Sequence, residues 1–253
     1  MNETSEQNLC TDIIYGPVIS RRFGISLGIN LSGSGKYCSF NCIYCFRGKN
    51  DGSPDESEFL TSLPSVQSVL SALEEWINGP HEKIDDITFA GNAEPTNHPD
   101  FPEMIEGVIR LRDRYLKDVG LSVLTNGMGL IPRLNNRYMD VKDALIMVDN
   151  PCLKLDSGVP ETWRLISRPY ANVSFTEWFE AVKILDSPII QTILMNGIVD
   201  NTTEKELVKL KECYEILKPR KIHVMNINKP TAFSGVYPVG ETEFEKAKNF
   251  LIN

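Results

Sequence analysis

Three cysteines within one short stretch carry the most specific chemistry of this sequence. Cys38, Cys42 and Cys45 stand within residues 37–46 at a C-x3-C-x2-C spacing. A cuboidal [4Fe–4S] cluster normally takes four thiolates, so a tight group of three indicates one iron that the protein leaves open. An open iron beside a bound cofactor means chemistry, and the spacing therefore predicts a catalytic cluster.

Zinc is the competing interpretation, because Zn²⁺ also binds cysteine at short spacings. A structural zinc needs four ligands, and only a histidine or a remote cysteine could supply the fourth here. These candidates are scattered along the chain: His81, His98, His223, Cys10, Cys152 and Cys213. An iron–sulfur cluster is thus favoured. The remaining cysteines are expected to be core or incidental thiols, without an auxiliary cluster.

The segments that must position the cysteines alternate between strand-like and helix-like patterns. Strands are expected at residues 24–31, 84–90, 120–125, 152–156, 189–194 and 221–226. Helices are expected at residues 66–77, 99–117, 141–149, 173–185, 203–217 and 241–251. This alternation is typical of βα units on a parallel sheet. We therefore expect an α/β fold, a partial (β/α)6 TIM-like barrel with its active site at the carboxyl ends of the strands.

The chain has 253 residues, of which 42% are apolar and 24% charged, enough for one large domain with a substantial core. We expect an N-terminal extension at residues 1–23, the barrel at 24–226, and a C-terminal segment with a helix at 227–253. The first residues lack a basic and apolar leader, and no apolar run approaches the ~18 residues of a membrane span. A cytoplasmic protein without membrane partners is expected.

Polar residues follow the expected strand ends. Gly91, Asn92, Ala93 and Glu94 follow the second strand, Thr125 and Asn126 the third, Lys154, Asp156 and Ser157 the fourth; Gln191 and Asn226 belong to the last two. Alternation along a strand places Lys154 and Asp156 on one face. An ammonium that points into a barrel needs a partner, and a surface position is the alternative for Lys154.

The cysteine spacing resembles the signature of the radical S-adenosylmethionine (SAM) superfamily. This resemblance implies that the amino and carboxylate groups of SAM occupy the fourth iron. One electron then cleaves SAM, usually to methionine and a 5'-deoxyadenosyl radical that abstracts hydrogen from a substrate. A reductant such as flavodoxin is implied.

The resemblance also assigns roles to the strand ends. Residues 91–94 look like the family's "GGE" segment, which holds the SAM amino group, with Asn92 and Ala93 as departures and Glu94 retained. Thr125 and Asn126 resemble its "TNG" turn. Its remaining candidates are Lys154 and Ser157 for the SAM carboxylate, Asp156 for a ribose hydroxyl, Tyr44 for the adenine, and Gln191 and Asn226 for adenine edges or other polar groups. Core, packing or turn roles are the alternatives for the last three.

Nearly the whole chain, about residues 13–240, is similar to a compact group of Fe–S oxidoreductases related to the wyosine-type tRNA synthases. The shared segments are residues 15–24, 26–30, 91–99, 154–158, 167–169 and 191–192 together with the cysteine loop. Ser167 stands where the group usually has Asn, and Lys229-Pro230 where Arg-Pro is common. These departures bear on the substrate more than on SAM cleavage.

Charge gives one hint about the substrate. The net charge of −8 argues against binding nucleic acid across a broad basic face. Residues 13–50, however, contain no acid and hold five cations, namely Arg21, Arg22, Lys36, Arg47 and Lys49. These cations either offset the cluster and pair with the SAM carboxylate, or form an electropositive entrance for an anionic substrate.

The sequence therefore predicts a radical SAM enzyme that acts on a peptide, a protein, another macromolecule or an anionic compound. The short flanking segments leave little to form a lid, which favours a large substrate. tRNA-base modification related to wyosine synthesis is the alternative within enzymes. A non-catalytic Fe–S or zinc module for electron transfer or partner binding is the alternative outside them.

Overall fold

The computed structural model describes residues 9–50 and 63–253, which form two compact units. The described residues of the N-terminal unit are 9–38 and 63–152, and those of the C-terminal unit are 39–50 and 153–253. From residue 9 onward, the chain passes between the units inside the cysteine loop, again between residues 50 and 63, and again inside one strand. Each unit is described by itself below.

The six expected strands are all present. They are β2 (Gly24–Ile29), β3 (Asp86–Phe89), β4 (Gly120–Thr125), β5 (Asn150–Lys154), β6 (Ile189–Leu194) and β8 (Lys221–Asn226). With an additional strand β1, they follow the order β1-β2-β3-β4-β5-β6-β8 in a seven-stranded sheet. The pairs β2–β3, β3–β4 and β6–β8 are parallel. The predicted α/β fold with parallel strands is confirmed.

Strand β1 (Ile14–Ser20) was not predicted, because it lies in what the sequence indicates as an N-terminal extension. It pairs antiparallel with β2, and its register shifts between Tyr15 and Val18. Gly16 and Pro17 occupy that interruption. Proline cannot donate a ladder hydrogen bond and is confined to edges and bulges, so the strand signal is broken in the sequence although the pairing exists.

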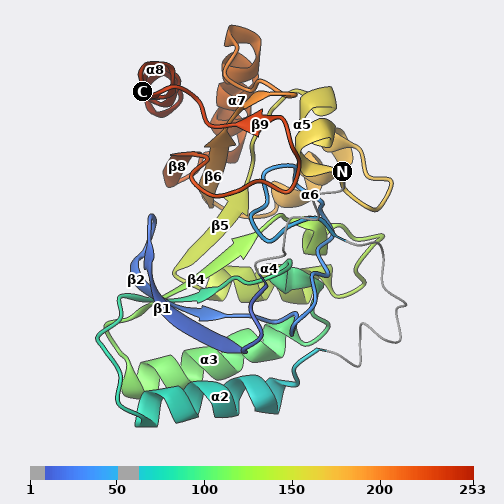
Figure 1. Cartoon of the computed structure of the whole chain (residues 1–253). Coiled ribbons are helices and arrows are strands. Elements are labelled where there is room, and N and C mark those ends of the chain that lie inside the picture. Colours follow the sequence, from blue (N-terminus) through green and yellow to red (C-terminus); the bar gives the residue numbers. More distant parts are fainter. Residues whose placement is uncertain (1–8, 51–62) are drawn as a thin grey trace, which may run out of the picture. The chain divides into compact units, whose positions relative to one another are not determined.

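The described part of the N-terminal unit contains three helices: α2 (Val66–Asn78), α3 (Phe101–Tyr115) and α4 (Tyr138–Met147). Helices α2 and α3 lie side by side in Figure 1. The Ser65 side chain caps α2 by accepting from the Ser68 amide at 3.1 Å. Two short 3-10 turns, η1 (Pro95–Asn97) and η2 (Met128–Leu130), follow β3 and β4. They shape the ends of those strands.

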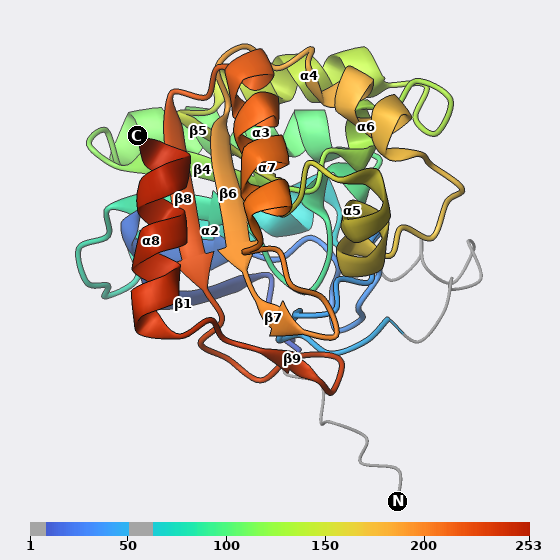
Figure 2. The ribbon, with the colours of Figure 1, turned by 90° about the horizontal axis from the view of Figure 1, so that it is seen from above.

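The C-terminal unit contains α5 (Pro160–Ser167), α6 (Phe175–Val182), α7 (Glu204–Leu217) and α8 (Glu241–Ile252), and a small sheet of β7 (Asn196–Gly197) and β9 (Val236–Tyr237). Figure 2 shows α7 and α8 beside β6 and β8. Helix α5 was not predicted, although it is as long as the predicted α6. It packs through Trp163 on Trp178 of α6, with ring centroids 5.3 Å apart. None of the described helices is long and apolar enough to span a bilayer.

Candidate functional site

The cysteine loop is held in the C-terminal unit by the end of α5. The Asn41 amide donates to the Ser167 carbonyl at 3.0 Å, and the Ile43 amide donates to the Ile166 carbonyl at 3.0 Å. On its other side, the Ile43 carbonyl accepts from the Phe233 amide at 3.1 Å. Ile43 and Ile166 are buried in one apolar cluster that Phe233 packs against. The unpredicted helix α5 thus shapes the loop that carries two of the cysteines.

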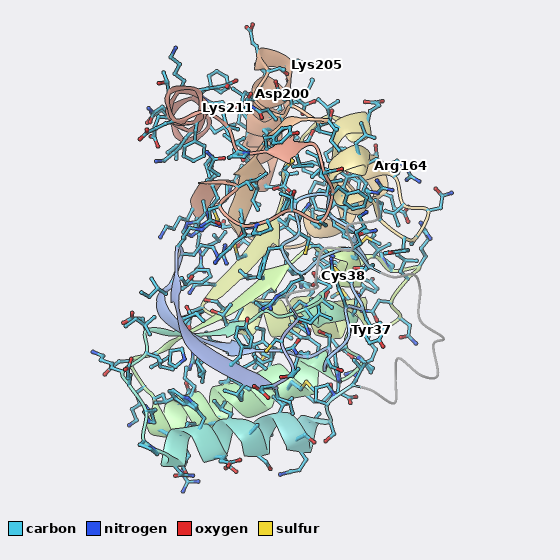
Figure 3. All side chains as sticks on the ribbon, viewed as in Figure 1. Tyr37, Cys38, Arg164, Asp200, Lys205 and Lys211 are labelled. Atoms are coloured by element: carbon cyan, nitrogen blue, oxygen red, sulfur yellow. The ribbon has the colours of Figure 1, made fainter. Side chains whose placement is uncertain are left out.

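The three cysteines of the loop are partly exposed and form no disulfide. Cys42 and Cys45 lie in one tight turn of the C-terminal unit, closed by the Cys45 amide on the Cys42 carbonyl at 3.0 Å. Cys38, labelled in Figure 3, belongs to the N-terminal unit. There, the Asn126 side-chain amide donates to its sulfur at 3.8 Å.

The other cysteines behave as expected for core thiols. Cys152 and Cys213 are buried. Burial raises the pKa of the Cys152 thiol to about 12 and that of Cys213 to about 11. Both therefore stay protonated near neutral pH and are poor metal ligands. Cys10 is partly exposed, and its thiol contacts the Asp12 carbonyl at 3.4 Å.

Glu94 is a buried carboxylate that joins the ends of two parallel strands. Its Oε1 accepts from the hydroxyls of Thr96 at 2.8 Å and Thr125 at 2.6 Å, and its Oε2 accepts from the Asn126 amide at 2.7 Å. Among the described residues, no cation pairs with it. Desolvation is the largest influence and raises its pKa despite these donors. From the described residues Oε2 accepts this single bond, so the carboxylate can still accept a bond from a cationic group.

The turn after β4 supports both Glu94 and Cys38. Gly127 has a φ of 79°, the left-handed region that glycine adopts without strain. Its amide donates to the Thr125 hydroxyl at 3.0 Å, and the Met128 amide donates to Asn126 Oδ1 at 3.0 Å. These bonds direct the Asn126 side-chain amide to the Cys38 sulfur. Thr125 and Asn126 thus contact two other predicted site residues.

The segment before Glu94 fixes the N-terminal part of the chain. Asn92 Nδ2 donates to the carbonyls of Cys10 at 2.8 Å and Gly33 at 2.9 Å, and its Oδ1 accepts from the Cys10 amide at 2.8 Å. Its own amide donates to Asn30 Oδ1 at 3.2 Å. The Asn30 role was missed, although Asn30 ends a shared segment of the sequence. Gly91 packs so closely on the Asn30 side chain that an added Cβ would lie 2.4 Å from Oδ1, and Ala93 is partly exposed.

Lys154 and Asp156 form an ion pair, with Nζ and Oδ2 2.7 Å apart. The same Oδ2 accepts from the Tyr44 hydroxyl at 2.8 Å, and Oδ1 accepts from the Ile193 amide at 2.8 Å. Lys154 Nζ also donates to the Ser167 hydroxyl at 3.0 Å. The expectation that the two charged side chains share a face is confirmed. Asp156 joins the cysteine loop, through Tyr44, to β6.

The phenol of Tyr44 lies near the two thiols of its turn. Burial is the main reason that its pKa lies well above the ordinary value, and the charges of Asp156, Cys42 and Cys45 act in the same direction. A neutral phenol donates a hydrogen bond, as the contact with Asp156 requires. Tyr44 therefore positions the cysteine turn, and its contact with adenine stays a prediction.

The remaining candidates have internal partners as well. The buried Ser157 hydroxyl contacts Glu206 at 2.6 Å and accepts from the Val159 amide at 2.9 Å. Asn226 Nδ2 donates to the Val239 carbonyl at 2.8 Å. The Gln191 carbonyl accepts from the Leu155 amide at 2.9 Å. Contacts of these side chains with SAM stay predictions.

The donor set fits an iron–sulfur cluster in its chemistry. Cys38, Cys42 and Cys45 are partly exposed thiols outside any disulfide and lie within eight residues of sequence, whereas the buried thiols stay protonated. Within residues 9–50 and 63–253, no group of three or more His, Cys, Asp or Glu side chains is gathered as a metal site. The three thiols are divided between the two units, and their convergence on one cluster stays a prediction.

Comparison with known proteins identifies relatives of the chain. Its residues 34–212 match the family profile described as the Radical SAM superfamily. A UPF0026 protein of Methanocaldococcus jannaschii is 30% identical over 233 residues, which are 89% of this chain and 67% of that protein. A protein named GTPase Obg from Brachyspira hyodysenteriae is 26% identical over 252 residues, or 98% of this chain. The chain spans only 34% of the length of the latter.

Solved structures share the fold. A radical SAM methyltransferase from Sphaerobacter thermophilus superposes with a TM-score of 0.58 at 13% identity, over 89% of this chain and 62% of that one. TYW1 with a bound lysine-pyruvate adduct gives a TM-score of 0.55 at 16% identity, over 90% of this chain and 74% of that one. These likenesses confirm the predicted partial-barrel fold and concern the fold alone.

Proposed function

From the premise that the chain belongs to the radical SAM superfamily, we propose that it reductively cleaves SAM at a [4Fe–4S] cluster and abstracts hydrogen from a peptide, macromolecular or anionic substrate. Enzymes of this superfamily need a reductant, and a flavodoxin would serve. In this proposal Cys38, Cys42 and Cys45 hold the cluster. When bound, the cluster and SAM supply one-electron cleavage of a carbon–sulfur bond.

The observation that carries the proposal is the environment of Glu94. A buried carboxylate without a cation is costly, and its raised pKa reflects that cost. An ammonium group beside Oε2 would offset the cost and lower the pKa. The amino group of SAM is such a cation. Glu94 would thus hold the SAM amino group while Thr96 and Thr125 keep its carboxylate oriented.

The neighbouring side chains act on the cysteines in this proposal. Asn126 donates to the Cys38 sulfur, which stabilises the thiolate form that a metal ligand requires. Asp156 holds Tyr44, and so positions the turn of Cys42 and Cys45. Asp156 is therefore proposed as a positioning residue in addition to its candidate contact with ribose. Lys154 and Ser157 are retained as candidates for the SAM carboxylate.

The remaining SAM contacts are proposed from the resemblance. Tyr44 would contact the adenine, and Gln191 and Asn226 would contact its polar edges. The backbone of Gly91, Asn92 and Ala93 would surround the SAM amino group. tRNA-base modification stays a second proposal. Its support is the likeness of the fold to that of TYW1, at 16% identity.

The decisive test is anaerobic reconstitution of the full chain with iron and sulfide, followed by reduction with SAM present. We expect 5'-deoxyadenosine in the chromatographed products, and its loss in Cys42→Ala. Cys10→Ala is the matched control, since Cys10 is also a partly exposed free thiol. An intact cluster that yields no 5'-deoxyadenosine would overturn the proposal, as would equal loss in both variants.

A further inference from the structure

Two cations converge on one aromatic ring in the C-terminal unit. Lys49 Nζ lies 4.7 Å from the centroid of the Phe233 ring, and Arg168 Cζ lies 4.5 Å from it. We call these three residues the Phe233 cluster. The Phe233 amide bonds the Ile43 carbonyl of the cysteine loop. The cluster is therefore joined directly to that loop.

The cluster is built from segments of the chain that contain no acidic residue. It draws on three segments, residues 39–50, 162–176 and 216–240, and none contains Asp or Glu, although the whole chain has a net charge of −8. Within the part of the chain that the structure describes, no carboxylate pairs with Arg168. Two like charges near one ring repel each other, so an anion bound near both would be stabilised.

Arg168 is held in an uncommon backbone conformation. Its φ of 46° and ψ of 60° place it in the left-handed region at the C-cap of α5. This conformation costs a non-glycine residue about 1 to 2 kcal/mol. The Arg168 carbonyl accepts from the Asn41 amide at 3.1 Å, so the loop contact maintains it. Strained residues of this kind cluster at ligand sites.

Two exposed aromatic rings belong to the chain segments that form the cluster. Phe46 of the cysteine loop is 42% exposed, and Arg47 Cζ lies 4.6 Å from its ring centroid. Tyr237 follows Phe233 on the same segment and is 57% exposed. Alternating cations and exposed rings are typical of surfaces that bind phosphates and stack the attached bases.

We propose that the Phe233 cluster binds a phosphate group of the substrate. The Arg168 guanidinium matches two phosphate oxygens with parallel donors, and the Lys49 ammonium adds a point charge. A base attached to the phosphate would stack on an exposed ring. This inference rests on the proposed function only in naming the bound molecule as the substrate; phosphate binding itself requires neither SAM nor an electron.

Fluorescence anisotropy tests the inference with a labelled oligouridylate of about 12 nucleotides, bound to the full chain reconstituted with iron and sulfide. Unlabelled AMP as competitor distinguishes a free nucleotide from a nucleic-acid chain as the source of the phosphate. AMP displaces the labelled oligouridylate from a site for single nucleotides, whereas only unlabelled oligouridylate displaces it from a site for a nucleic-acid chain. Either pattern supports a phosphate site, provided that the cluster variants weaken binding more than their control variants do. An acidic peptide of equal charge serves as the carboxylate probe.

Matched variants remove a cation inside or outside the cluster. Arg168→Ala is compared with Arg164→Ala, which changes a second exposed arginine of the same helix; Arg164 Nη1 donates to the Val173 carbonyl at 3.3 Å. Lys49→Ala is compared with Lys211→Ala, because Lys211 Nζ lies 5.0 Å from the Phe250 ring centroid. Figure 3 labels both control residues, on α5 and α7.

We expect Arg168→Ala and Lys49→Ala each to weaken binding about tenfold, and the two controls less than about twofold. Equal losses in a variant and its control would overturn the inference. So would binding of the acidic peptide with equal affinity and equal dependence on Arg168. Phe233→Leu retains an apolar side chain, and its expected loss of binding with an unchanged melting temperature separates the site from a folding defect. Because no SAM is present, a failure here leaves the 5'-deoxyadenosine test of the proposed function intact.

Discussion

Two buried carboxylates near strand ends satisfy their charge in different ways. Glu94 in the N-terminal unit accepts only from hydroxyls and amides, and no cation among the described residues pairs with it. Asp156 in the C-terminal unit accepts from a neutral phenol and an amide, and it also pairs with the Lys154 ammonium. Both side chains are less than one-tenth exposed. Neutral donors orient Glu94 but leave its charge uncompensated, whereas Asp156 is neutralised inside the protein.

This difference separates two roles that the sequence alone assigns to one cofactor. An uncompensated carboxylate gains most from an incoming cation, so Glu94 is the better candidate for a ligand ammonium. A paired carboxylate already has its cation, so Asp156 is the better candidate for holding the cysteine loop in place. The predictions below test this division.

Asp156→Ala is expected to have the largest effect on stability. It leaves the Lys154 ammonium without its partner and removes the acceptor of the Tyr44 hydroxyl and the Ile193 amide. Breaking one side of a buried pair costs about 3 to 5 kcal/mol. Urea unfolding measures the loss. The double variant Lys154→Met/Asp156→Asn should recover part of it, and no recovery would show that charge pairing is not the cause.

Glu94→Gln is expected to weaken SAM binding about a hundredfold, because a neutral amide cannot balance the charge of the SAM ammonium group. A hundredfold loss of affinity corresponds to about 2.7 kcal/mol of binding free energy. The cost of this variant in stability should be only about 1 to 2 kcal/mol, since no internal cation loses a partner. Equilibrium dialysis of the reconstituted protein measures the affinity. Asp86→Asn is the matched control, because Asp86 is also a buried carboxylate and lies at the start of β3. If both variants bind SAM alike, Glu94 does not hold its amino group.

Asp86 provides a test of the uncompensated state outside the site. Burial is the largest influence and raises its pKa from 3.8 to about 6, although Ser122 and Thr88 donate to it. The folded pKa lies above the unfolded value, so the ionised group lowers stability above pH 6. This cost disappears as the pH falls from about 6 to 4, a gain of about 2 kcal/mol. Asp86→Asn should remove this contribution when unfolding is measured from pH 7.5 to 4; an unchanged profile would contradict it.

Thr125→Val is expected to have the smallest effect. It removes one donor to Glu94 and the acceptor of the Gly127 amide, at a cost of about 1 kcal/mol in the free energy of unfolding. Loss of that donor should also raise the pKa of Glu94 further, so SAM affinity should fall more steeply below neutral pH than in the unchanged protein. Calorimetric titration with SAM at two pH values checks this. Parallel pH profiles would indicate that Thr125 does not tune Glu94.

Strands and longer helices were predictable because their signal is local. β4, β6 and β8 were predicted with their observed bounds, and α7 began and ended within one residue of expectation. The interrupted strand β1 and the eight-residue helix α5 were missed. In both, the pairing or packing partner supplies what the local pattern lacks.

The candidate site was predictable to the extent that motifs named its residues. The sequence indicated Glu94 and Lys154, and alternation placed Lys154 beside Asp156 correctly. It did not indicate that Asp156 would accept a hydrogen bond from Tyr44, 112 residues away. It also did not indicate that the Ser167 hydroxyl would accept a hydrogen bond from Lys154. No local pattern encodes these contacts, because the two partners meet only after the strands and the loop have folded.

The sequence by itself determined the superfamily signature and the alternation of strands and helices, since cysteine spacing and hydrophobic periodicity are properties of short segments. Only the tertiary structure decided which polar groups meet in the interior. Burial makes each unpaired charge costly. The tertiary contacts therefore distinguish Glu94, which pairs with no cation of the described residues, from Asp156, which pairs with Lys154. The same structure brought three acid-free segments together around Phe233, a feature distributed too widely along the chain for any motif to reveal.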